Sequence, residues 1–230
     1  MAPPQSFLPS RDGFAFNNSW PPAPAVSMDT AFGEIDVGNA ADGLCGGMVF
    51  AALDYWYAGK TPPVTQPKPK SRVYKFFVKR IIDSWHVPIG VAQYFTWMNL
   101  PDGDVGFTAF GHHVTVEHGI SGRTINQQWP AIRADLDRGI PSALGLVTVE
   151  SRSPAELGQN HQVLAYAYDV AGSKVTLHVY DPNSAQDDTV TISFDTSHPT
   201  RATKFNHTIN IGHPIRGFFR TAYSPVAPPG

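Results

Sequence analysis

The chain of 230 residues carries 17 basic and 19 acidic residues, a formal net charge of −2, and a single cysteine. The sequence does not show the clustered basic residues typical of nucleic-acid-binding proteins, because its basic residues are scattered except between residues 68 and 80. One cysteine excludes an internal disulfide and any zinc site built from several cysteines. The length suits a single domain with a substantial core.

The sequence predicts neither a membrane span nor a signal peptide. No run approaches about 18 apolar residues. The N-terminal stretch, MAPPQSFLPSRDGF, has neither the basic nor the apolar region of a secretory signal. We therefore expect a soluble, cytoplasmic protein without membrane or nucleic-acid partners.

The first half of the chain is predicted to be mostly helical. Residues 1–25 are rich in proline and are expected to form an extended segment over the domain surface, with one short strand at 13–16. Apolar residues at helical spacing predict helices over 45–58, 71–85, 90–100 and 126–138. In the second of these, the basic residues are expected on the solvated face. Short extended segments are predicted at 31–37, 105–108 and 113–116.

From residue 140 onward the apolar residues alternate, which is typical of strands. Strands are predicted at 141–149, 162–169, 174–180, 189–194 and 216–223, with a hairpin turn at 171–173. Helices followed by strands indicate an α+β fold in which a helical half packs on an antiparallel sheet. The predicted organisation is one domain over 26–224, preceded by the extended segment 1–25 and followed by a flexible tail, 225–230.

Cys45 lies where a glycine-rich loop meets a predicted amphipathic helix, GNAADGLCGGMVFAALDYWYAG. A helix N-terminus offers unpaired N–H groups and the positive end of the helix dipole, both of which favour a thiolate. A lone cysteine beside an apolar helix is also commonly a packing residue. The glycines at 43, 46 and 47 favour the reactive interpretation, because bare backbone lets another molecule approach closely.

A thiol nucleophile needs a base, and the base needs a group that orients it. His161 begins a strongly apolar strand, and the hairpin that follows returns the chain to Asp181. If residues whose numbers sum to about 343 lie opposite each other, Asp181 falls beside His161. A bulge would shift this register and favour Asn183 instead. Ordinary structural roles are open to both: His161 as a satisfied core or edge histidine, and the Asp-Pro-Asn sequence as a turn.

These motifs, a glycine-flanked cysteine at a helix start, then HQVLAYAYD, then YDP, resemble the papain-like cysteine peptidases, especially the peptidase C39-like branch, over residues 39–194. The resemblance implies a papain-like fold with Cys45 as nucleophile, His161 as general base and acid, and Asp181 as orienting group. Family members carry an oxyanion-hole glutamine six residues before the cysteine. Asn39 stands there in this chain, so the amide donor has a shorter reach.

The expected chemistry is acyl transfer through a thioester, on a peptide or a small amide, ester or thioester, without a cofactor. Transglutaminase-like enzymes and other cysteine acyltransferases use the same three residue types, and they remain an alternative. A second alternative is a papain-like binding module that has lost the chemistry. A third alternative is a metal site at His112, His113 and His118. It is disfavoured because the side chains of adjacent residues on a strand, such as His112 and His113, point to opposite faces.

Overall fold

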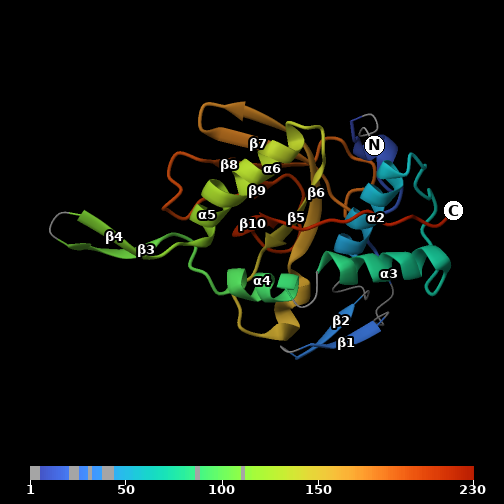
Figure 1. Ribbon diagram of the computed structural model, residues 1–230, viewed down its shortest axis with the longest axis horizontal. Coiled ribbons are helices and arrows are strands. Elements are labelled where there is room, and N and C mark those ends of the chain that lie inside the picture. The colour runs from blue at the N-terminus through green and yellow to red at the C-terminus, as the bar shows by residue number, and fades with distance from the viewer. Residues whose placement is uncertain (1–5, 21–25, 31–32, 38–43, 86–88, 110–111) are drawn as a thin grey trace.

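The computed structural model describes residues 6–20, 26–30, 33–37, 44–85, 89–109 and 112–230. A curved, six-stranded antiparallel sheet lies at the centre, and helices pack on both of its faces (Figure 1). Its strand order is β10-β5-β6-β7-β8-β9. This arrangement confirms the predicted α+β class. None of the described helices combines the length and the apolar character needed to cross a bilayer.

The sheet is built almost entirely from the C-terminal half of the chain. Its strands are β5 (Ser142–Val147), β6 (His161–Ala171), β7 (Lys174–Tyr180), β8 (Thr191–Asp195), β9 (Asn206–His207) and β10 (Gly217–Arg220). Every residue of β5 is buried, because Leu144 and Leu146 face one core cluster while Ala143 and Val147 face the other. A strand covered on both sides explains the continuous apolar run in the sequence. The two-residue strand β9 was not predicted.

On one face lie α2 (Cys45–Tyr57), α3 (Arg72–Ser84) and α4 (Ile89–Met98). Residues 45–56 of α2 are all buried, so the prediction of an amphipathic helix there is wrong. The helix is enclosed because α3 packs along one side and β6 along another. The side chain of Ser71 caps the N-terminus of α3. Gly59, with φ +61°, follows the C-terminus of α2, where glycine commonly ends a helix.

The opposite face of the sheet is covered by one continuous helical stretch. It consists of α5 (Ile120–Arg123), a π-helical turn (Thr124–Gln128) and α6 (Trp129–Leu136), so the predicted helix at 126–138 begins six residues earlier. Trp129, Ile132 and Leu136 point into the core beneath it, as their spacing predicted. A 3-10 turn (Pro154–Gln159) precedes β6 and brings the chain to His161.

Two small hairpins stand apart from this sheet. One pairs β1 (Val26–Thr30) with β2 (Gly33–Val37), and the other pairs β3 (Val105–Ala109) with β4 (His112–Glu117). The β3–β4 hairpin projects well away from the body of the molecule (Figure 1). Along its strands, Val105, Phe107 and Val116 are exposed.

The segment from Phe7 to Phe16 and the C-terminal segment pack onto α2 and α3. The prediction of a strand at 13–16 is wrong, because these residues are irregular and follow a short helix, α1 (Pro9–Asp12). The ring of Phe14 packs against that of Phe77, with 4.9 Å between the ring centroids. The C-terminal segment, predicted to be a flexible tail, makes contacts with α2. Pro228 and Pro229 are buried, and the Tyr55 hydroxyl donates to the carbonyl of Pro229 at 3.0 Å.

Candidate active site

Cys45 is the first residue of α2 and is 7% exposed. As the first helical residue, it has no carbonyl within the helix to accept its N–H. The residue before it is held in place from the N-terminal segment, because the Leu44 N–H donates to Asn18 Oδ1 at 2.8 Å. The thiol therefore lies at a fixed helix N-terminus, close beneath the surface.

His161 begins β6 and faces Cys45 and Asp181 together. Its Nε2 lies 2.8 Å from Asp181 Oδ1, and Cys45 lies close enough to the ring to raise its pKa. Because Asp181 occupies Nε2, Nδ1 is the ring nitrogen left for the thiol. Burial by itself would lower the pKa of His161, but the charges of Asp181 and Cys45 and the hydrogen bond with Asp181 hold that pKa well above its usual value.

Asp181 follows directly after β7, and its carboxylate is fully buried. Oδ1 accepts hydrogen bonds from His161 Nε2 and from the Asn183 N–H, each at 2.8 Å. Burial would raise the pKa of Asp181, yet the charge of His161 and the surrounding hydrogen bonds bring it far below its usual range. The carboxylate is therefore ionised and directed at the imidazole.

The hairpin register differs from the one expected. Cross-strand partners sum to 345 near the turn, as for Ala171 and Lys174, and to 344 beyond a bulge at residues 165–167, as for Leu164 and Tyr180. The strand pairing ends at Tyr180, and the chain then turns so that Asp181 reaches His161. Asn183, the alternative, instead donates its N–H to Asp181 and accepts from Asn18 Nδ2 at 3.2 Å. Asn39, the predicted oxyanion-hole residue, lies outside the described residues.

Two residues that the sequence did not indicate also border this cluster. His207 Nε2 lies 3.0 Å from Asp181 Oδ2, and its side chain is 4% exposed. Tyr94, on α4, places its hydroxyl 3.4 Å from the His161 carbonyl, and burial together with the charge of Cys45 raises its pKa well above the usual value. Both come from segments distant in sequence, so no local pattern could have linked them to Cys45.

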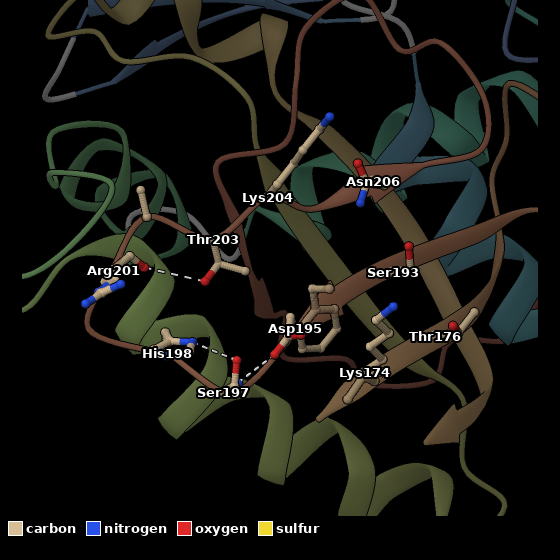
Figure 2. A pocket seen from close by; sticks show the side chains of 13 residues that line it. Lys174, Thr176, Ser193, Asp195, Ser197, His198, Arg201, Thr203, Lys204 and Asn206 are labelled. Carbon is tan, nitrogen blue, oxygen red and sulfur yellow. Dashed lines mark hydrogen bonds between the residues drawn. The ribbon is translucent and has the colours of Figure 1, made fainter. Parts of the chain in front are cut away.

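A broad hollow of about 670 Å³ lies elsewhere, on β7, β8 and the loop that follows them (Figure 2). It is rimmed by Lys174, Arg201 and Lys204, and none of Cys45, His161 and Asp181 lines it. Figure 2 shows that Arg201 and Lys204 point away from each other, so these cations do not converge on one position. The hollow therefore has no geometric connection with the thiol.

The side chains of His112 and His113, which the possible metal site would need, lie outside the described part of the structure. His118 Nδ1 lies 3.0 Å from Asp104 Oδ2, and the side chain of His118 is 65% exposed. Within the part of the chain that the structure describes, no group of three or more His, Cys, Asp or Glu side chains is arranged to hold a metal ion.

Comparisons of the chain with protein-family models, with curated proteins and with solved structures found no match. The cluster formed by Cys45, His161 and Asp181 is therefore the feature of the molecule that points to a function.

Proposed function

We propose that the protein is a cysteine-dependent acyl-transfer enzyme of the peptidase or amidase type, with a papain-like, C39-like arrangement of its helical and sheet halves. The observation that carries the proposal is the chain of contacts from the buried Asp181 through His161 to Cys45. A thiol, a base within hydrogen-bond reach and a group that orients the base are the parts that such chemistry requires.

In the first half of the reaction, the Cys45 thiolate attacks the carbonyl carbon of an amide, ester or thioester. A C–S bond forms and the carbonyl electron pair moves onto oxygen. As the tetrahedral intermediate collapses, the bond to the leaving group breaks and His161 gives its Nδ1 proton to the departing nitrogen, oxygen or sulfur atom. Asp181 stabilises the imidazolium and keeps the ring in the orientation that points Nδ1 at the sulfur.

In the second half, water attacks the thioester while His161 Nδ1 accepts a proton from it. The carboxylic acid leaves, and the thiolate and imidazolium are restored. An amine in place of water would make the same cluster an acyltransferase. The choice between these outcomes depends on which nucleophile reaches the thioester.

The developing oxyanion needs N–H donors near the sulfur. The proposal assigns one to the backbone N–H of Cys45, which has no partner inside α2, and a second to the side chain of Asn39. The helix dipole of α2 (13 residues) adds positive potential at the same place.

The first experiment labels the only thiol of the chain, which makes every adduct assignable. Intact-mass measurement of iodoacetamide alkylation at about pH 5.5 should show Cys45 reacting at least about tenfold faster than a free cysteine peptide. His161→Gln should abolish this advantage. His178→Gln is the matched control, because His178 makes a similar contact with Asp169 at 2.7 Å on the outside of the same hairpin. Equal rates for the wild type and His161→Gln, both matching the free peptide, would refute the proposal and favour a binding module.

The second experiment tests the acyl step itself. An activated ester such as p-nitrophenyl acetate should give a stoichiometric burst and an acetyl adduct on Cys45 that hydroxylamine removes, with no burst from Cys45→Ser. Transfer of the acetyl group to an added primary amine faster than to water would identify an acyltransferase. Acetylation confined to lysines would contradict a Cys45 thioester.

A further inference from the structure

His207 has a side chain that is 4% exposed, and long-range strand pairing places it beside the candidate active site. It lies on β9, where its register partner on β8 is Ile192, a core residue. Facing residues of paired strands project from the same side of the sheet, so the imidazole enters the interior beside Asp181. Three hydrogen bonds between Thr191 and Thr208 hold β9 at this position.

The hydrogen bonding of His207 defines its tautomer. Its Nδ1 accepts the backbone N–H of Ile209 at 3.1 Å. A ring nitrogen that accepts a hydrogen bond carries no proton, so the proton of a neutral His207 is on Nε2. Nε2 is the atom that faces Asp181 Oδ2 at 3.0 Å.

The two facing atoms have no other partner. Asp181 Oδ2 and His207 Nε2 are both fully buried, and neither is aligned with any other hydrogen-bonding group among the described residues. At 3.0 Å they are within hydrogen-bond distance of each other, although the N–H does not point directly at the oxygen. An unpaired donor and an unpaired acceptor in contact, both shielded from water, are a complementary pair.

We propose that His207 is a positioning residue of the candidate active site, which donates from Nε2 to Asp181 Oδ2 and thereby keeps Oδ1 on His161. This inference rests on the proposed acyl-transfer function. Asp181 then contacts a different histidine through each of its oxygens: His161 through Oδ1 and His207 through Oδ2. Without the Nε2 donor, Oδ2 has no partner, and the carboxylate loses the contact that opposes its rotation.

The test compares the pH profile of Cys45 alkylation in the full chain and in three variants. His207→Met removes the donor while keeping an apolar side chain of similar length. His207→Gln retains an N–H donor with a reach similar to that of Nε2. His213→Met is the control, since His213 is an exposed histidine six residues away.

We expect His207→Met to slow alkylation at about pH 5.5 by about tenfold, the effect of losing one charge-assisted hydrogen bond. His207→Gln should stay within about threefold of the wild type, because a neutral donor suffices. His213→Met should match the wild type. Rescue by glutamine separates loss of the donor from general damage to β9, which both substitutions at His207 would cause.

Two results overturn the inference, and they are distinguishable. If His207→Met keeps the wild-type profile while His161→Gln is slow, His207 has no positioning role and the proposed function stands. If the wild type itself reacts no faster than a free thiol, both fail. Should His207→Met not fold, long-range ¹H–¹⁵N spectra of the wild type at about pH 7.5 decide the matter. A protonated Nε2 and an unprotonated Nδ1 on His207 support the inference, and the opposite tautomer refutes it.

Discussion

Arg80 on α3 and Asp54 on α2 form an almost wholly buried ion pair, with Nε 2.7 Å from Oδ2 and side chains that are 2% and 0% exposed. The guanidinium also contacts Asp83 and the carbonyl of Ser224. Asp54 accepts a further hydrogen bond from the Tyr223 hydroxyl at 2.7 Å. The expectation that the basic residues of this helix lie on its solvated face is therefore wrong for Arg80, which joins α2, α3 and the C-terminal segment.

Arg80→Met should destabilise the protein by about 3–5 kcal/mol, because it leaves the Asp54 carboxylate buried without its cation. Burial already raises the pKa of Asp54 against the opposing effects of Val226, Tyr223 and Arg80. Removing Arg80 raises that pKa further, so the loss of stability should shrink as the pH is lowered and the carboxyl takes up a proton. Urea unfolding at two pH values measures both effects. Lys79→Met, at the exposed neighbouring position, should change stability by less than about 0.5 kcal/mol. An equally small effect of Arg80→Met would contradict the burial argument.

Asp181→Asn should slow the alkylation of Cys45 at about pH 5.5 by about tenfold or more. The substitution removes the charge that raises the pKa of His161, so the imidazolium that stabilises a thiolate is lost. Asp169→Asn is the matched control. Asp169 lies 2.7 Å from His178, but its side chain is 77% exposed. If the two variants reacted alike, the contact between Asp181 and His161 would have no special role.

The stability that His161 and Asp181 provide should depend on pH in a defined window. Because the pKa of His161 is raised on folding, this residue contributes stability that is fully present below its unfolded-state pKa of about 6.5. That stability is lost as the pH rises through the folded-state pKa. The lowered pKa of Asp181 gives a contribution that is present above about 3.8 and is lost at more acidic pH. The difference in unfolding free energy between the wild type and His161→Gln should therefore be largest between about pH 4 and 6.5. Denaturant titrations from about pH 3.5 to 9 measure it, and a constant difference would contradict the assigned charges.

Local signals were sufficient to find Cys45, His161 and Asp181. A glycine-flanked cysteine marks a helix start, a histidine precedes an apolar strand, and a short hairpin brings Asp181 back to it. The exact register was not needed, because Asp181 lies beyond the last paired residue and reaches His161 through the turn that follows.

His207 could not be found in this way. It lies on a strand of two residues, which is too short for an alternating pattern, and its position depends on pairing with β8. The burial of Arg80 was hidden for a related reason: its partner is on another helix, and a basic residue at helical spacing ordinarily indicates solvent. In both cases the deciding contact joins segments distant in sequence.

The glycines that follow Cys45 have a different role from the one expected. The sequence predicts that they let another molecule approach, but a Cβ on Gly47 would lie 2.2 Å from the carbonyl oxygen of Phe77 on α3. A Cβ on Gly46 would meet the side chains of Ser84 and Gln162 at 2.5 and 2.6 Å. The close approach is thus made by α3 and β6 of the same chain, and it sets how near α3 lies to the start of α2.

Gly47→Ala should therefore lower the free energy of unfolding by about 2 kcal/mol or more. The overpacking penalty exceeds the roughly 1 kcal/mol that alanine adds to helix stability. Gly46→Ala should cost less, because the obstructing atoms belong to side chains that can move, whereas a backbone carbonyl moves only with its helix. Thermal unfolding of the two variants measures this order. If Gly47→Ala were as stable as the wild type, α3 would not be held against α2 by this contact. A Gly46→Ala protein that folds but alkylates slowly would show that the support beneath Cys45, from Ser84 and Gln162, also controls the position of the thiol.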